Sequence, residues 1–394
     1  MKTYPTLLIA ILCLFSSLCS AQDGPETTRP ERGEELTARL GERCQAILDA
    51  LVERGLSGAS AALVLPGGEV VARAAGLADV DTGAPLTTAG RMLSGSVGKT
   101  YVTGVVQRLL ADGLLALDER PFATAGPEWL SRVPNARAAT LRQLMTHTSG
   151  IPRYVFDPAF AAQINAEPQQ VWTDRERFAY LFDAEPLFAP GADFAYSDSN
   201  YLLVGMAIEQ VTGRPFYELA QEWLIEPHGL KDTVPSDSVD VPGVVQGHVF
   251  MGGGLGVPER TLDAGRFVYN VQFEWCGGGW ASTPADLARW AGILYSGEAV
   301  EGDDLPAMLD TVSARPLGPG VEYGLCVMVR DTEAGRLLGH DGFMPGYLSS
   351  MGYFPESGLA AAIQLNTDDG RRVGRPLSAV LVELVQAAQA ELAR

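Results

Sequence analysis

The feature of this 394-residue chain that most constrains its fold is a block of β-like sequence near the C-terminal end. Four runs rich in apolar, β-branched and aromatic residues follow one another, separated by short turns such as 331–334 and 355–358. Strands joined by short turns pair antiparallel, because a parallel partner needs a long crossover. The sequence therefore predicts an antiparallel sheet from the runs 323–329, 335–340, 347–354 and 359–365.

The N-terminal part of the chain supplies the same kinds of element. Apolar residues recur at helical spacing from Leu36 to Val52. Two β-like runs, 61–65 and 69–75, follow and are joined by Pro66-Gly67-Gly68, which is typical of a hairpin. At the other end of the chain, a last helix is predicted over 377–392.

Both ends of the chain thus carry helices and strands that can share one layer. The simplest arrangement is an α+β fold in which the two chain ends build one antiparallel sheet flanked by helices. The middle of the chain mixes short helical runs with loops rich in proline and glycine, and we predict a mainly helical inserted domain. The expected boundaries are 36–113 and 271–394 for the sheet domain and 114–270 for the insertion.

Residues 1–21 have the features of a secretory signal peptide. Lys2 gives a positive start, 7–18 an apolar core, and the small residues before the cut predict cleavage after Ala21. A large residue beside Cys19 disfavours a lipoprotein anchor there. Residues 22–35 are predicted as a flexible leader. The mature protein is expected to be secreted or periplasmic without stable membrane insertion, since no later segment has about 18 uninterrupted apolar residues.

Composition excludes several classes of function. There are 48 acidic against 29 basic residues, a formal charge of −19, which argues against nucleic acid because phosphate binding depends on clustered cations. The four histidines lie far apart and no cysteine motif is typical of zinc, so neither a metal nor another cofactor is predicted. Cys44, Cys276 and Cys326 remain after the predicted cleavage, and their spacing selects no disulfide.

A serine and a lysine form the first chemical motif. Lysines are rare, since the chain has only Lys2, Lys99 and Lys231, and Lys99 lies three residues after Ser96, before a helix predicted over 102–110. In a helical turn the two side chains share one face, so the amine can take the serine's proton and make it a nucleophile. That role needs a lysine that is neutral part of the time, and burial and the helix N-terminus both lower a lysine pKa. The alternative is a capped helix with Lys99 in solvent.

Four further segments resemble the serine β-lactamase-like hydrolases, which include class C β-lactamases, D-alanyl-D-alanine carboxypeptidases and related esterases. The resemblance spans about 36–390 with the segments in the family's order, and it implies the β-lactamase/transpeptidase-like fold. The segments are Leu144-Met145-Thr146-His147-Thr148-Ser149-Gly150, Phe194-Ala195-Tyr196-Ser197-Asp198-Ser199-Asn200-Tyr201, the stretch 277–287, and Gly339-His340-Asp341-Gly342 followed by Pro345-Gly346-Tyr347.

The resemblance implies a role for each matching position. Ser96 would be the acylated nucleophile, Lys99 its proton acceptor or relay, and Tyr196 a partner acid/base, able to serve if nearby cations depress its phenol pKa. His340 would bind a substrate carboxylate or shuttle protons. The backbone N–H groups of Ser96 and Phe343 would form the oxyanion hole. Whether Lys99 or Tyr196 is the general base is left open.

Three more positions follow from the same match, and a fourth, Arg330, from its place near the end of a predicted strand. Asp198 stands where the family has asparagine, and its carboxylate would introduce a negative charge near Lys99 and could hold that lysine cationic. Gly342 would help to form the sheet edge that pairs with an extended substrate. His147 is interpreted as a structural residue that fixes a loop, and Arg330 is a candidate for binding a substrate carboxylate.

Together these observations predict a secreted serine acyl hydrolase that forms an acyl-enzyme on Ser96. A histidine at 340 where lactamases have lysine favours a D-Ala-D-Ala carboxypeptidase-like peptidase. The alternatives are an esterase, a weak class C-type β-lactamase, or a non-catalytic penicillin-binding or peptide receptor. The expected partner is a small molecule or peptide with a reactive acyl group, and the sequence does not indicate the oligomeric state.

Overall fold

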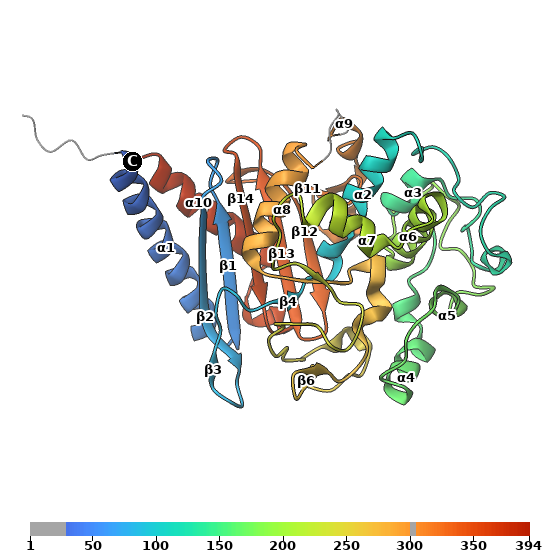
Figure 1. Ribbon diagram of the computed structural model, residues 1–394, viewed down its shortest axis with the longest axis horizontal. Helices are drawn as coiled ribbons and strands as arrows, with labels where there is room; N and C mark the ends of the chain where they lie inside the picture. The colour runs from blue at the N-terminus through green and yellow to red at the C-terminus, as the bar shows by residue number, and fades with distance from the viewer. Residues whose placement is uncertain (1–28, 300–304) are drawn as a thin grey trace, which may run out of the picture.

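The computed structural model describes residues 29–299 and 305–394, so the predicted signal peptide and the start of the predicted leader lie outside the described residues. The centre of the fold is a nine-stranded antiparallel sheet in the order β3-β2-β1-β14-β13-β12-β11-β10-β9 (Figure 1). Its strands are β1 (Gly58–Val64), β2 (Val70–Asp79), β3 (Ala84–Pro85), β9 (Val312–Ser313), β10 (Glu322–Tyr323), β11 (Met328–Thr332), β12 (Gly335–Met344), β13 (Tyr347–Phe354) and β14 (Leu359–Leu365).

The first and last parts of the chain meet inside this sheet, as predicted. β1 pairs with β14 through partners from Ala59 opposite Leu365 to Val64 opposite Ala360. Smaller pairings join β4 (Met92–Leu93), β5 (Val234–Pro235) and β8 (Trp280–Ser282), and β6 (Leu262–Asp263) with β7 (Arg266–Phe267). The mixed α+β class with a large antiparallel sheet is therefore confirmed.

Helices cover both faces of the sheet. α1 and α10 pack on one face and α8 on the other, while α2, α3, α6 and α7 pack against one another beside the sheet (Figure 1). The helices are α1 (Arg29–Glu53), α2 (Lys99–Ala111), α3 (Leu141–Met145), α4 (Pro158–Ala166), α5 (Asp174–Ala179), α6 (Asp198–Thr212), α7 (Phe216–Ala220), α8 (Pro284–Ser296), α9 (Leu305–Met308) and α10 (Leu377–Leu392).

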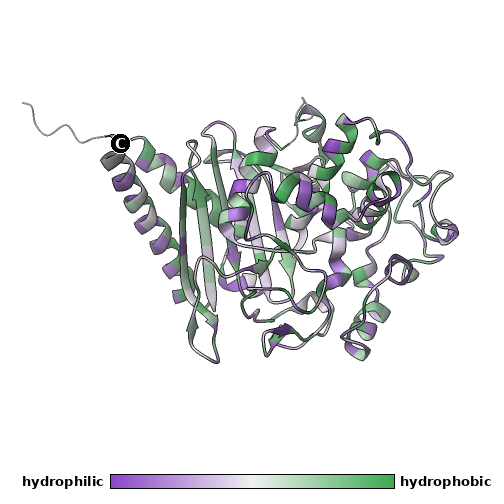
Figure 2. Ribbon diagram, viewed as in Figure 1, coloured by the Kyte–Doolittle hydropathy of each residue, from purple (hydrophilic) through white to green (hydrophobic). Residues whose placement is uncertain are grey.

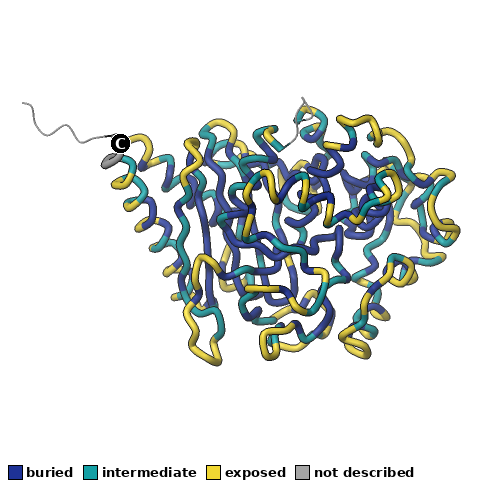
Figure 3. The backbone as a smooth tube through the Cα atoms, viewed as in Figure 1, coloured by how far each residue is buried: buried dark blue, intermediate teal, exposed yellow. Residues whose placement is uncertain are grey.

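Side chains that alternate along the central strands build two cores. In β14, Ala361 and Ile363 join the core under α1 and α10, whereas Ala360 and Ala362 join the core that continues into the helical region. In Figure 2 strand β1 is largely apolar, while β12 and β13 also carry polar residues, and Figure 3 shows the strands in the middle of the sheet as buried. Because both faces of the sheet are covered, β14 carries apolar residues at every position except Gln364 instead of alternating with polar ones.

Three sequence expectations need correction. Helix α1 begins at Arg29, within the segment predicted as a leader, because a proline such as Pro30 is compatible with the first turn of a helix. The run 323–329 is two strands, since the chain turns between β10 and β11 and Cys326 has a φ of 58°. Strand β12 extends past His340 to Met344. The domain boundaries stay a prediction, although α2, assigned to the sheet domain, packs against α6 and α7.

Candidate active site

Ser96 lies on a short 3₁₀ turn, η1 (Gly95–Gly98), that leads directly into α2. Lys99 follows this turn as the first residue of α2, and it is completely buried. Its Nζ donates to the Ser96 Oγ at 3.0 Å. Side chains three residues apart eclipse in a 3₁₀ turn, so this turn, rather than the first turn of an α-helix, brings the two side chains together.

Two glycines let the Ser96 turn lie against strand β12. A Cβ on Gly342 would overlap the carbonyl oxygen of Ser94. Gly95 has a φ of 53°, and a Cβ there would lie 2.7 Å from the backbone nitrogen of Phe343. The backbones of the turn and the strand are therefore adjacent, which is the arrangement that an oxyanion hole from Ser96 and Phe343 requires.

Strand β12 runs beyond its partner β11 at the same place. β11 pairs with Gly335–Gly339, whereas the pairing of β12 with β13 continues to Met344. In the part of the chain that the structure describes, no strand pairs with 340–344 on the β11 side. An open strand edge of this kind can accept an extended peptide by strand addition.

Lys99 is held as a cation by its surroundings. Burial lowers its pKa, but attraction to the Asp198 carboxylate, with smaller effects of Tyr196 and Glu274, outweighs burial and raises the pKa above its usual value. The Nζ lies 2.6 Å from Asp198 Oδ1 and also donates to the carbonyl oxygen of Gly277. Burial therefore does not leave this lysine partly neutral, and Asp198 holds it cationic, as the sequence analysis considered.

Asp198 accepts from two cations. It is buried at the N-terminus of α6, where a negative charge is favourable, and its Oδ2 lies 2.6 Å from Nη2 of Arg153. Burial raises the pKa of this carboxyl, but attraction to Arg153 and then to Lys99 outweighs burial. The pKa is therefore lowered below its usual value, and the carboxyl stays ionised. Sequence reasoning missed Arg153, because nothing in its local sequence distinguishes it from the many other arginines of the chain.

Tyr196 is buried beside this ion pair with its ring 5.1 Å from Lys99 Nζ. Its hydroxyl faces Ser96 but makes no hydrogen bond within 3.5 Å to any described residue. Burial raises the pKa of Tyr196 to about 12, although Lys99 and Ser96 oppose the effect. The depression by cations on which its acid/base role would depend does not prevail, because loss of hydration outweighs the attraction to Lys99.

His340 is buried with both ring nitrogens engaged. Nδ1 lies 2.7 Å from the backbone oxygen of Asp341 and must donate to it, so Nε2 accepts from the Tyr323 hydroxyl at 2.9 Å. Burial, and then the charge of Lys99, lower the pKa of His340 to about 4. The ring is neutral and has no free N–H for a substrate carboxylate in this arrangement, so its contribution to the reaction stays a prediction.

His147 has the structural place that the sequence analysis expected. Its Nδ1 accepts from the backbone N–H of Ser197 at 3.2 Å, and its carbonyl oxygen accepts from Ala195 N at 3.0 Å. The ring also lies against Tyr196, with centroids 4.0 Å apart. His147 therefore holds the segment that carries Tyr196 and Ser197.

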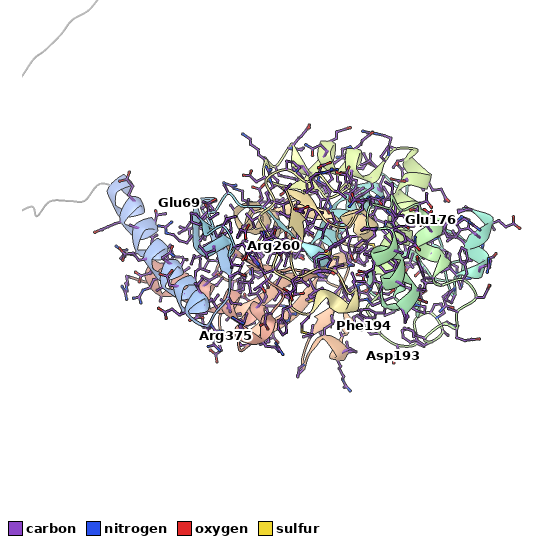
Figure 4. The ribbon with its side chains drawn as sticks, turned by 90° about the horizontal axis from the view of Figure 1, so that it is seen from below. Glu69, Glu176, Asp193, Phe194, Arg260 and Arg375 are labelled. Carbon is purple, nitrogen blue, oxygen red and sulfur yellow. The ribbon has the colours of Figure 1, made fainter. Side chains whose placement is uncertain are left out.

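Two cavities meet at Ser96, and Arg153 and Phe343 also line both. We call the larger one, of about 460 Å³, the Arg375 cavity, and the smaller one, of about 310 Å³, the Glu274 cavity. Arg375, labelled in Figure 4, lines the first and pairs with Glu383. The Arg375 cavity is further lined by Tyr196, Leu317, Met328, Asp341, Gly342, Leu348, Ser349, Gly370, Val373, Pro376 and Leu377. The Glu274 cavity is further lined by Val155, Phe156, Asp198, Gly253, Leu255, Phe273, Met344 and Pro345.

Arg330 lies elsewhere than expected. Its guanidinium is 2.8 Å from Asp341 Oδ2, and it lines neither cavity. The structure instead places two other cations at the larger cavity, Arg375 and Arg153. Sequence reasoning also missed Glu274, which has no motif of its own.

Three further properties concern the described residues. Cys44, Cys276 and Cys326 are buried free thiols. Within 29–299 and 305–394, no group of three or more histidine, cysteine or acidic side chains could hold a metal ion. In these same ranges no helix combines the length and the apolarity needed to cross a bilayer.

Comparison with known proteins shows the family of this chain. Residues 44–384 match the Beta-lactamase family. The chain therefore belongs to the beta-lactamase family, and it is a serine hydrolase of that family.

Relatives with different activities share the fold. The D-alanyl-D-alanine-carboxypeptidase/endopeptidase AmpH of Escherichia coli (strain K12) is 30% identical over 287 residues, which are 72% of this chain and 67% of AmpH. Esterase EstB of Burkholderia gladioli is 32% identical over 204 residues, 50% of this chain and 51% of EstB. The solved structure of a D-stereospecific amidohydrolase from Streptomyces sp. matches 84% of this chain and 97% of its own, with 29% identity and a TM-score of 0.72.

Proposed function

We propose that this protein is a peptidase or amidase for substrates that contain D-amino acids, and that it works through an acyl-enzyme on Ser96. The observation that carries the proposal is the 3.0 Å contact between Ser96 Oγ and Lys99 Nζ at the junction of two cavities. The names of AmpH and of the Streptomyces amidohydrolase support the D-amino acid substrates.

In the first step, Ser96 Oγ attacks the scissile carbonyl carbon, and its proton passes to the Tyr196–Lys99 pair. The backbone N–H groups of Ser96 and Phe343 stabilise the oxyanion. The tetrahedral intermediate collapses, the bond to the leaving amine breaks, and the amine takes a proton from the Tyr196–Lys99 pair. Water then attacks the ester carbonyl and gives a proton to the same pair. The bond between the acyl carbon and Ser96 Oγ breaks, the pair returns the proton to Oγ, and the acid leaves.

Proton transfer sets a condition on this reaction. Lys99 is cationic and Tyr196 is neutral, so one proton must leave the pair before Ser96 can be deprotonated. Activity is therefore expected to rise with pH on the alkaline side of neutrality. Either residue can lose that proton, and the general base remains Lys99 or Tyr196.

Two cavities can hold the two sides of a scissile bond. In the carboxypeptidase form of the activity, a peptide occupies the acyl side and a free carboxylate occupies the leaving-group side. Arg375 supports binding of that carboxylate in the larger cavity. Its partner Glu383 is partly exposed to solvent, whereas Arg153, the other cation of this cavity, is paired with the buried Asp198. We propose the Arg375 cavity as the leaving-group side.

Asp198 argues against efficient β-lactam turnover. Both carboxylate oxygens already accept from Lys99 or Arg153. A carboxylate also has no donor for the carbonyl oxygen of an acylamino side chain, unlike an amide. We expect only slow hydrolysis of cephalosporins.

Export remains part of the proposal. The sequence of residues 1–21 supports it, and we infer a secreted or periplasmic enzyme that meets its substrate outside the cytoplasm.

The test is acylation of Ser96. The wild type should hydrolyse a D-Ala-D-Ala peptide or a D-aminoacyl p-nitroanilide, and a fluorescent penicillin should label it covalently. Ser96→Ala should lose both, and Ser131→Ala, an exposed serine on a distant turn, should lose neither. Intact mass spectrometry should locate the adduct on Ser96. Reversible peptide binding without turnover or labelling would refute the proposal in favour of a receptor.

A further inference from the structure

Glu274 is a carboxylate inside the site that has no partner of its own in the part of the chain that the structure describes. It lies on the segment 271–277, is half-buried, and lines the smaller cavity together with Ser96. Among the described residues, no hydrogen bond or salt bridge reaches its carboxylate. The contrast with Asp198 is clear, because that neighbour binds both nearby cations.

The backbone around Glu274 is shaped to hold the carboxylate there. Cβ atoms on Gly277 and Gly278 would lie 3.2 and 3.1 Å from Glu274 Oε2, so glycines leave the oxygen room over the backbone. The next residue, Trp275, has a φ of 38°, a strained value for an aromatic residue. Strain of this kind concentrates at functional sites, where the surrounding structure maintains it.

The rest of the cavity is mostly apolar. Phe156, Leu255, Phe273 and Phe343 line it with other apolar residues, and Arg153, which also lines it, is already paired with Asp198. A volume of about 310 Å³ is at the small end of the range for small-molecule sites. The cavity therefore suits one residue with an apolar side chain and a positive charge.

The charges around Glu274 favour a cationic ligand when the carboxylate is ionised. Burial raises its pKa to about 7, and the charge of Asp198 acts in the same direction, whereas Lys99, Arg153 and Arg177 lower it. An ammonium group in the cavity would stabilise the ionised form. A substrate carboxylate would instead be repelled.

We propose that Glu274 binds the free α-ammonium group of the residue that acylates Ser96, and that the apolar cavity holds that residue's side chain. The substrate class is then an aminoacyl amide or a peptide cleaved after its first residue. This inference rests on the proposed function and names the end of the substrate that is recognised. It favours an amino-terminal over a carboxy-terminal peptidase, because a long acyl peptide has no ammonium at this position.

The test compares three substrates on the full-length protein. D-phenylalanine p-nitroanilide has a free ammonium, N-acetyl-D-phenylalanine p-nitroanilide lacks it, and p-nitrophenyl butyrate reports on Ser96 alone. The wild type should prefer the free amine. Glu274→Gln should raise KM for that substrate about tenfold or more, with little change for the acetylated substrate and the ester. Glu128→Gln, which removes an exposed carboxylate outside both cavities, is the matched control.

Several outcomes would overturn the inference. One is a wild type that prefers or requires the acetylated substrate, and another is an unchanged KM for the free amine in Glu274→Gln. An equal loss on all three substrates would show that Glu274 serves the chemical step and not recognition. If the ester is hydrolysed through Ser96 while the free amine is not, the ammonium site is refuted and the hydrolase stands; if Ser96 is never acylated, the proposed function itself fails.

Discussion

The two sides of the active site are built in different ways. On the sheet side, the turn η1 and strand β12 place backbone groups of Ser96 and Phe343, and the close approach depends on Gly95 and Gly342. On the helical side, charged side chains line the site. They are Asp198 at the start of α6, Arg153, and Glu274 on the segment 271–277. The geometry of the sheet side therefore depends on backbone packing, and that of the helical side depends on paired charges.

This difference separates two kinds of requirement. Backbone N–H groups need only an accurate position, which the sheet provides through close contact. Charged groups need compensation when they are buried, and here Lys99, Asp198 and Arg153 compensate one another. Substitutions on the sheet side should therefore change rate through geometry, and those on the helical side should change the dependence on pH or substrate charge.

The largest effect is expected where the two sides meet, at Lys99. Lys99→Met removes the amine 3.0 Å from Ser96 Oγ, and kcat should fall by about 10²–10⁴-fold. Lys231→Met, at the other lysine of the described residues, should keep normal activity. Steady-state kinetics with the best substrate checks both variants. Retention of wild-type kcat in Lys99→Met would remove the lysine from the mechanism.

A second effect tests the sheet side alone. Gly342→Ala would force the added methyl group against the carbonyl of Ser94 and push the turn away from β12. A displacement of about 1 Å can cost about 10²-fold in rate, so kcat should fall by that order while the pH profile keeps its shape.

Gly67→Ala is the control for this substitution, because nothing lies within 4 Å of a Cβ at that position. Kinetics together with thermal unfolding separates lost geometry from lost stability. A Gly342→Ala enzyme with normal kcat would show that the approach of the two backbones does not matter.

The third effect is smaller in rate and tests the helical side. Asp198→Asn removes the charge that raises the pKa of Lys99, so this pKa should fall. A lysine with a lower pKa is neutral at lower pH, and the rising limb of kcat/KM against pH should move to lower pH. The measurement is a pH profile with an ester whose own ionisation does not change. If the rising part of the kcat/KM profile stays at the same pH in Asp198→Asn, the ionisation of Lys99 does not control it.

The fold and the nucleophile could be predicted because their signals are local. The hairpin, the C-terminal strands and the last helix each follow from the spacing of apolar residues and turns, and β1 and β14 then meet as expected. Ser96 and Lys99 lie within one turn, so their contact needs little information from elsewhere. The structure bears out the negative charge of Asp198 beside Lys99.

The protonation states and the charged partners were not predictable from local sequence. Arg153 and Glu274 reach the site from segments that carry no motif, and only packing shows that Arg153 binds Asp198 while Glu274 binds nothing among the described residues. The net pKa shifts of Lys99 and Tyr196 could not be worked out from the sequence either. Burial and neighbouring charges act through space with opposite signs, and the sum depends on distances that only the tertiary structure sets.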